Sequence, residues 1–404
     1  MPLPGTGVVL SGGGARGAYE AGVLAGIMEV LRPAAAPFDV FSGTSVGAFN
    51  AAYLAAHAHE PDMALPGLLS RWQSLEVGRH LKLDLRGVLG FKRQWTRSGE
   101  DQAGVGMRVP AGTVGRTLLS SVALEELACE AIDWQRLHDN VASGRVKALT
   151  LAALHIASGR TTVFSELPAG EELAPSMTER CVAVYGPVGP DHVLASAAIP
   201  LLYPARYVDG EYYCDGGVRF NTPISPAIRA GAQRLVVISL LLDDGQAETD
   251  LPARVDAYQS PVYLIGKVLN ALLLDPLAYD LKVLQRYNEL LDVLTSQLDA
   301  DAFERVQSEL ALRRGSPYRQ MPTLVFTPSQ DIGLIARRRA DRIRASRFSS
   351  WLLARTAALG SVWESDLLSF VLFDAEFAAE LVRLGRDDAV VRAQEIRAFF
   401  CGAS

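Results

Sequence analysis

The sequence predicts an α/β protein with a mostly parallel central sheet and helices packed on its faces. Two observations indicate this fold class. The first fifty residues alternate strand, glycine-rich loop, helix, strand, tight turn and helix, an order typical of parallel β-α-β units. Two further apolar runs, Arg234–Leu242 and Pro322–Pro328, are predicted to complete the sheet.

The N-terminal units are defined by apolar periodicity and by helix breakers. Gly7–Leu10 is a short apolar run that predicts a buried strand. The helix after the glycine loop has an amphipathic stripe and ends near two prolines. Residues 38–43 predict the second strand, and the alanine-rich residues 48–58 predict the second helix. The stripe consists of Ala21, Leu24, Met28 and Leu31, and the prolines are Pro33 and Pro37.

Helical and strand-like segments follow without an internal repeat. Residues 61–144 are mostly helical, apart from the polar, glycine-rich stretch Ser98–Gly112, which predicts a mobile surface loop. Two strand-like runs then meet at a Ser158–Gly159 turn. Residues 260–314 and nearly everything after Ile335 are predicted to be helical.

Length and composition describe a packed globular protein. Its 404 residues leave room for one large domain or two ordinary ones, and we divide them at a soft boundary into a core (5–228) and a sheet-completing, helical region (229–404). Hydrophobic residues make up 49% and charged residues 21%, which excludes a disordered chain. The net charge of −6 argues against a nucleic-acid partner.

Several further classes are disfavoured. The cysteines are scattered and form no C-x-x-C pair, so we expect buried free thiols and no metal site. The N-terminus lacks a basic segment followed by an apolar one, which argues against a signal peptide. No apolar run reaches the roughly 18 residues of a membrane span. We therefore expect a cytoplasmic protein. The cysteines are Cys129, Cys181, Cys214 and Cys401.

The opening glycine loop has two interpretations. Gly12, Gly14 and Gly17 match the dinucleotide-binding pattern G-x-G-x-x-G between a strand and a helix. The same loop could instead direct backbone N–H groups at an oxyanion. A dinucleotide site also needs an acidic residue at the far end of the second strand, but Asp39 begins that strand. The turn around Ser45 occupies the required position, so we favour the oxyanion interpretation and keep a dinucleotide-dependent oxidoreductase as an alternative.

The segment Gly43–Gly47 matches G-x-S-x-G between the second strand and the second helix. In this pattern a serine occupies a strained strand-to-helix turn, and glycines on either side allow close backbone packing. Ser45 would then be a nucleophile beside a helix N-terminus, whose dipole favours anionic intermediates. The alternative is that Ser45 only caps the helix.

A nucleophilic serine needs a base, and Asp215 is the better candidate. Asp209–Gly210 predicts a hairpin turn between two aromatic-rich strands, and Asp215 follows immediately before Gly216 and Gly217. The alternative is that this second segment is simply another turn. None of the histidines has a sequence context that marks a triad member. They are His57, His59, His80, His138, His155 and His192.

Taken together, these motifs resemble the patatin-like phospholipase family. The resemblance rests on Gly12–Gly17, Gly43–Gly47 and Asp215–Gly217 in that order, and on the segments Ala195–Tyr207 and Asn221–Pro223. It implies a three-layer α/β/α fold over residues 7 to about 228. The later segment Glu364–Ala389 looks like the helical tail of bacterial members.

The resemblance implies a catalytic dyad without metal or cofactor. Ser45 would be the nucleophile and Asp215 the base, with the substrate a fatty-acyl ester of a phospholipid or glycerolipid at a membrane surface. Because a carboxylate is a weaker base than imidazole, we expect either that partial burial raises the pKa of Asp215 or that the helix dipole assists the proton transfer. The alternatives are a short-chain esterase or thioesterase, and a lipid-binding scaffold with little turnover. The oxyanion loop would comprise Gly12, Gly13 and Gly14, with Arg16 orienting it.

Three surface features are weaker candidates for lipid contact. The cluster Arg337–Arg347 could attract anionic headgroups, but we favour a solvated helix paired with acidic residues. The segment Val262–Leu274 could bind an interface, but a core helix is the better interpretation. The Ser98–Gly112 loop is a candidate lid.

Overall fold

The structure of the protein, a computed structural model, describes most of the chain. Five of the predicted features lie outside the described residues: Pro33, His80, the Ser98–Gly112 loop, the Val262–Leu274 helix and the end of the arginine cluster at Arg347. The described residues are 5–32, 37–75, 113–114, 125, 128–176, 180–200, 202–242, 276–314, 317–345 and 365–401.

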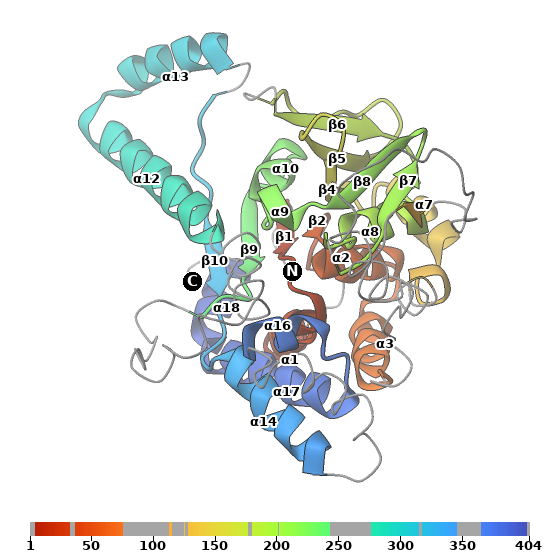
Figure 1. Cartoon of the computed structure of the whole chain (residues 1–404). Helices are drawn as coiled ribbons and strands as arrows, with labels where there is room; N and C mark the ends of the chain where they lie inside the picture. The colour runs from red at the N-terminus through yellow and green to blue at the C-terminus, as the bar shows by residue number, and fades with distance from the viewer. Residues whose placement is uncertain are drawn as a thin grey trace, which may run out of the picture.

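A ten-stranded sheet lies at the centre of the fold, and its middle strands are parallel (Figure 1). Strand β1 (Thr6–Leu10) pairs in parallel with β2 (Val40–Thr44) on one side and β9 (Arg234–Ile238) on the other. Strands β10 (Thr323–Phe326) and β4 (Ala148–His155) extend this parallel set at its two ends. The predicted mostly parallel sheet is therefore confirmed, and β9 and β10 belong to it.

Antiparallel strands continue the sheet beyond β4. Strand β8 (Glu211–Asp215) pairs with the end of β4 and forms a hairpin with β7 (Ala205–Val208). The hairpin turns at Asp209–Gly210, as the sequence predicts. Strand β3 (Thr113–Val114) pairs with β7, and β5 (Thr161–Glu166) pairs with the other edge of β4. This side of the sheet is mixed.

Some elements differ from the sequence-based prediction. Strand β6 (Cys181–Tyr185) lies at an edge, parallel to β5, and its side chains are half-buried or exposed, so it lacks a buried strand's apolar signature. Helix α8 (Pro190–Ser196) has only seven residues, too few to establish a helical period. The strand predicted at Arg234–Leu242 ends at Ile238, and the remaining residues up to Leu242 lie outside the sheet.

Side chains of β1 alternate between two apolar cores, one on each face of the sheet. Val8 and Leu10 contribute to the larger core, whereas Val9 contributes to the smaller one. Helices lie against both faces, so the fold has three layers, α/β/α. Helices of the larger core include α1 (Ala18–Leu31), α2 (Val46–Ala56) and α17 (Ala375–Val391). Helices of the smaller core include α10 (Ile224–Arg229) and α12 (Pro276–Gln297).

The C-terminal helix α17 packs closely across α1, near the start of the chain (Figure 1). A Cβ atom at Gly22 would lie 2.2 Å from the carbonyl oxygen of Val382. A Cβ atom at Gly385 would lie 2.3 Å from the carbonyl oxygen of Tyr19. Glycine on both helices therefore allows the two backbones to touch, and this contact ties the C-terminal region to the N-terminal core.

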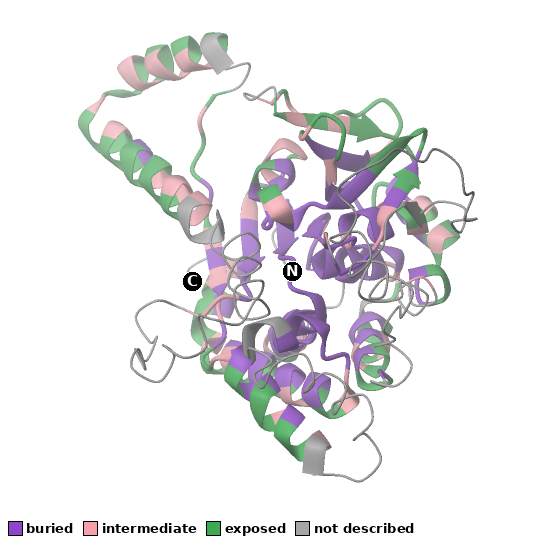
Figure 2. Cartoon of the chain, viewed as in Figure 1, coloured by how far each residue is buried: buried purple, intermediate pink, exposed green. Residues whose placement is uncertain are grey.

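The other helices surround this framework. Helices α12 and α13 extend away from the sheet and present mostly exposed and half-buried residues (Figures 1 and 2). Within the described part of the chain, no helix combines the length and the apolar character that crossing a membrane requires. The remaining helices are α3 (Pro61–Gln73), α7 (Trp134–Ala142), α9 (Gly217–Phe220), α13 (Ala300–Arg314), α14 (Ile332–Ala345), α16 (Ser365–Val371) and α18 (Ala393–Cys401), and a 3-10 turn, η1 (Gly14–Gly17), precedes α1.

Candidate active site

The register of β4 brings the ends of β2 and β8 together. Strand β2 pairs with β4 as far as Thr44, which lies opposite Ala152. Strand β8 pairs with the next part of β4 and ends with Asp215 opposite Ala153. The two strands share one edge of β4 and approach each other from opposite directions. The residue that follows Thr44, Ser45, is therefore placed against Asp215.

Ser45 occupies a sharp turn between β2 and α2. Its φ of 55° and ψ of −124° lie outside the regions that non-glycine residues usually adopt. Both flanking glycines are required by close backbone contacts. A Cβ atom at Gly43 would lie 2.2 Å from the carbonyl oxygen of Gly47, and one at Gly47 would lie 2.4 Å from that of Leu10. The predicted strained strand-to-helix turn is present.

The Ser45 side chain does not cap α2, so the capping interpretation is wrong. Ser45 stands at the N-cap position, but its hydroxyl makes no capping hydrogen bond. Its backbone N–H instead donates to the hydroxyl oxygen of Ser196 at 2.8 Å. The Ser196 hydroxyl in turn donates to the carbonyl oxygen of Ala152 at 2.6 Å. Ser196, on α8, thus holds the turn against β4, a role that the sequence does not reveal.

Asp215 is fully buried at the end of β8. Its Oδ1 accepts a hydrogen bond from the Gly217 N–H at 2.7 Å. Its Oδ2 is buried and has no hydrogen bond of standard geometry to any described residue. Burial raises the pKa of Asp215 to about 7, and the nearby Ser45 hydroxyl and the Gly217 N–H moderate this rise. The carboxyl group can therefore exchange a proton near neutral pH.

The glycine loop lies directly over Ser45. A Cβ atom at Gly12 would lie 3.0 Å from the Ser45 Cβ and also close to the Asn221 side-chain oxygen, so both residues contact the loop at Gly12. The Asn221 side-chain amide donates to the Gly12 carbonyl oxygen at 3.2 Å, and the Gly12 N–H donates to the Asn221 carbonyl oxygen at 3.3 Å. Within the described structure, the N–H groups of Gly13 and Gly14 donate no hydrogen bond. They are therefore free to bind an anion.

Helix α16, in the C-terminal region, also contacts the glycine loop. Arg16 is buried, with its Nε donating to the Ser369 hydroxyl at 2.7 Å and its guanidinium 4.4 Å from the centre of the Phe370 ring. A Cβ atom at Gly14 would lie 2.1 Å from the Phe370 carbonyl oxygen. Arg16 thus binds the loop to α16. Neither Ser369 nor Phe370 could be associated with the loop from the sequence.

A buried carboxyl group forms a hydrogen bond with the start of the glycine loop. Glu20 is fully buried, and its two carboxyl oxygens accept from the Ser11 N–H at 2.7 Å and the Asn50 side-chain amide at 2.9 Å. Burial raises the pKa of Glu20 well above its ordinary value, although both hydrogen bonds lower it. Glu20 is therefore a buried, hydrogen-bonded support that connects the start of α1 to α2.

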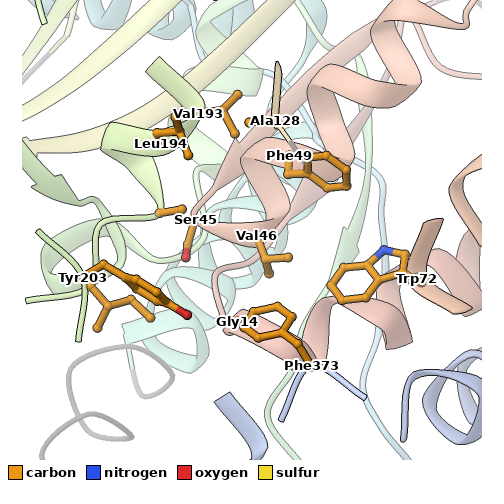
Figure 3. A pocket seen from close by; sticks show the side chains of 12 residues that line it. Gly14, Ser45, Val46, Phe49, Trp72, Ala128, Val193, Leu194, Tyr203 and Phe373 are labelled. Carbon is orange, nitrogen blue, oxygen red and sulfur yellow. The ribbon is translucent and has the colours of Figure 1, made fainter. Parts of the chain in front are cut away.

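An apolar pocket opens beside Ser45 (Figure 3). It contains about 490 Å³ of empty space, its open mouth included. Ser45 and Gly14 are part of its lining, so the glycine loop and the serine turn face the same space. The shape and lining suit an apolar chain. Its apolar walls include Phe49, Trp72, Val193, Leu194, Ile199 and Phe373.

The described histidines lie elsewhere. None of them hydrogen-bonds to Ser45 or Asp215: His57 bonds to the Tyr53 carbonyl oxygen, and His138 to the carboxylate of Glu166. His155 and His192 bond to groups in their own turns, and His155 also bonds to Glu211. Within the described residues, no group of three His, Cys, Asp or Glu side chains could hold a metal ion.

The cysteines are free thiols, but the prediction that they are buried is wrong for two of them. Cys214 is buried and Cys181 half-buried, whereas Cys129 and Cys401 are exposed because they lie on the outer faces of helices.

The described arginines of the cluster are partly paired with acidic residues. Arg339 forms an ion pair with Asp374 at 2.6 Å and another with Glu376, and Arg338 lies 3.6 Å from Glu380. These contacts agree with the interpretation that the cluster is a solvated helix with acidic partners.

The fold and this pocket define a class of α/β protein in which a serine turn, a buried aspartate and a glycine loop meet at the ends of the strands. The sequence model of the patatin-like phospholipase family matches residues 8–228, and the chain belongs to that family. The family consists of lipid-ester hydrolases. The dinucleotide-binding interpretation of Gly12, Gly14 and Gly17 is therefore not supported.

Two individual proteins are similar to parts of this chain or to most of it. It is 30% identical over 220 residues to a cGAMP-activated phospholipase of Pseudomonas aeruginosa (strain BWHPSA011 / Pa011), a match that covers 54% of this chain and 53% of the relative. The match therefore spans about half the length of that relative. The solved structure of VipD from Legionella pneumophila is 14% identical, with a TM-score of 0.34 over 98% of this chain and 68% of VipD. So low a score carries no conclusion about the fold.

Proposed function

We propose that the protein hydrolyses fatty-acyl esters of phospholipids or glycerolipids, with Ser45 as nucleophile and Asp215 as base. The observation that carries this proposal is the register of β4, which sets the ends of β2 and β8 against each other. The base needs a pKa near the working pH, and burial raises that of Asp215 to about 7. The pocket beside Ser45 supports an apolar acyl chain as the bound group.

In the first half of the reaction, Ser45 Oγ attacks the ester carbonyl carbon while Asp215 Oδ2 takes the hydroxyl proton. The carbonyl oxygen becomes an oxyanion that the N–H groups of Gly13 and Gly14 stabilise, with Gly12 and Arg16 holding the loop in place. Asp215 then returns the proton to the departing alkoxide. The products of this half are the lyso-lipid or alcohol and an acyl group bound to Ser45.

In the second half, water attacks the acyl-enzyme and Asp215 takes one of its protons. The tetrahedral intermediate collapses, the C–O bond to Ser45 breaks, and the proton returns to Oγ. The free fatty acid leaves through the pocket mouth. No metal or cofactor takes part in the proposed cycle.

The name of the Pseudomonas aeruginosa relative supports a phospholipid as substrate. We propose that the protein meets this lipid by peripheral contact with a membrane surface. A short-chain esterase or thioesterase would use the same Ser45 chemistry with a smaller acyl group or a thiolate leaving group. Comparing acyl lengths in one assay series decides between these substrates.

The test is hydrolysis of phosphatidylcholine vesicles and of a short p-nitrophenyl ester by the full chain, with and without cGAMP. We expect both activities in the parent protein and a loss of at least about 1,000-fold in Ser45→Ala and in Asp215→Asn. Ser296→Ala, on the exposed face of α12, is the matched control and should keep the parent rate. Ester hydrolysis that persists in Ser45→Ala would contradict the proposal.

A further inference from the structure

The Tyr203 hydroxyl is a buried polar group with no hydrogen-bond partner among the described residues. Tyr203 lies just after α8, where its N–H donates to the Ile199 carbonyl oxygen at 2.9 Å. Its side chain is only 6% exposed, yet its oxygen has no hydrogen bond to any described residue. Buried hydroxyls are nearly always hydrogen-bonded, so an unpaired one calls for an explanation. Burial also raises the pKa of Tyr203, so the group remains a neutral donor.

The Tyr203 side chain forms part of the wall of the pocket beside Ser45. Tyr203, Ser45 and Gly14 line the same space, and Figure 3 shows the Tyr203 oxygen turned toward the side where the other two lie. The lining offers few other polar side-chain atoms. Trp72 Nε1 already donates to the Asn50 side-chain oxygen at 3.1 Å. Among the described residues that line the pocket, Ser45 set aside, Tyr203 is therefore the one whose polar side-chain atom has no hydrogen bond to another side chain of the protein.

A bound acyl chain has polar atoms only at its ester end, which must reach Ser45. Of the two ester oxygens, the alkyl oxygen departs with the rest of the lipid. The carbonyl oxygen stays with the acyl group in the pocket through both halves of the reaction. The carbonyl oxygen gains negative charge in both transition states. A fixed hydrogen-bond donor in an apolar pocket therefore stabilises this oxygen more than it stabilises the alkyl oxygen.

We propose that Tyr203 donates a hydrogen bond to the ester carbonyl oxygen as it becomes an oxyanion, acting together with the N–H groups of Gly13 and Gly14. This inference rests on the proposed Ser45 chemistry and adds a side-chain donor to it. No described residue forms a hydrogen bond with this hydroxyl in the free protein, so we expect the bond to form with the substrate. Such a donor favours catalysis without contributing to the stability of the fold.

The test is Tyr203→Phe, which removes one oxygen and keeps the ring. We expect kcat to fall on the order of 100-fold with KM little changed, for alkyl and p-nitrophenyl esters alike. Labelling of Ser45 by a fluorophosphonate, whose phosphoryl oxygen occupies the same position, should slow in parallel. Thermal unfolding should show an unchanged or higher Tm, because the hydroxyl that is removed had no partner. Tyr53→Phe is the matched control, since the hydroxyl of this buried tyrosine faces Gly67 on α3 and should leave kcat unchanged.

Three results would overturn the inference. An unchanged kcat means that the hydroxyl does not contact the reacting atoms. A lower Tm together with lower activity means that it is structural. A loss confined to alkyl esters means that it binds the leaving oxygen. Failure of the proposed function has a different signature, namely a parent protein that is not labelled at Ser45.

Discussion

Asp215→Asn is expected to lose activity and to become more stable, relative to the parent protein, as the pH rises. In the native protein the pKa of Asp215 is raised to about 7 from an ordinary value of 3.8. The unfolded chain therefore loses this proton before the native state does, and stability falls as the pH rises between the two values. The difference is about 3 pKa units at about 1.4 kcal/mol each, or about 4 kcal/mol in total. Asparagine does not titrate, so the variant escapes this loss.

The assay is urea unfolding of the parent and of Asp215→Asn at a series of pH values from 4 to 8. The free energy of unfolding of the variant, relative to the parent, should increase by about 4 kcal/mol across this range. The other titrating groups contribute equally to the stability of both proteins, so their contribution disappears from the difference. Any cost of the asparagine amide that does not depend on pH disappears when the differences at two pH values are compared. In parallel, kcat/KM of the parent should rise with pH and level off above about 7, because only ionised Asp215 can accept the Ser45 proton. A stability difference that does not vary with pH would refute the raised pKa and the role built on it.

The remaining predictions concern the supports of the site. Relative to the parent, the stability of Glu20→Gln should increase from pH 4 to pH 8, because the raised pKa of Glu20 makes ionisation unfavourable in the native state, whereas the contact of the new amide NH2 with the Ser11 or Asn50 donor costs the same at every pH; a pH-independent difference in urea unfolding contradicts this. Ser369→Ala removes the acceptor for the buried Arg16 Nε, so kcat should fall by up to about 100-fold and the free energy of unfolding by about 1–3 kcal/mol; steady-state kinetics with an unchanged kcat would contradict the role of α16. Gly22→Ala forces a Cβ atom against the backbone of Val382 and should cost about 1–3 kcal/mol in urea unfolding; a fully stable variant would show that α1 and α17 can separate without cost.

The fold and the local geometry of the Ser45 turn could be predicted because their causes are local. The strand, glycine loop and helix order of the first fifty residues specifies parallel units, and the flanking glycines specify the strained turn at Ser45. The hairpin at Asp209–Gly210 likewise follows from a two-residue signal. The rise in the pKa of Asp215 was expected from the chemistry that a carboxylate base requires, and the burial of that residue supplies it.

The rest depends on contacts between distant parts of the chain. The adjacency of Ser45 and Asp215 follows from β4, whose edge receives one strand up to Ala152 and another from Ala153 onward. No periodicity in the sequence encodes that change of partner. Likewise, Arg16 binds Ser369 across 353 residues, and only the folded structure brings the C-terminal helix α16 to the glycine loop.

The burial of a polar group without a partner is also invisible in a sequence. Tyr203 belongs to a segment that the family resemblance already included, but its hydroxyl gains significance only from its place in the pocket. Ser196 is similar, since its hydrogen bonds to the Ser45 turn and to β4 depend on the short helix α8. Such residues are recognised from satisfied and unsatisfied hydrogen bonds.

The most direct test of the central claim is to identify the residue that becomes covalently modified. The full chain is treated with a fluorophosphonate, digested, and its peptides are sequenced by mass spectrometry, with Ser45→Ala and Ser296→Ala treated in parallel. A single phosphonylated serine at position 45, lost in Ser45→Ala and retained in Ser296→Ala, is the expected result. Modification at another residue, or an unmodified parent protein that still hydrolyses esters, would contradict a reaction that proceeds through Ser45.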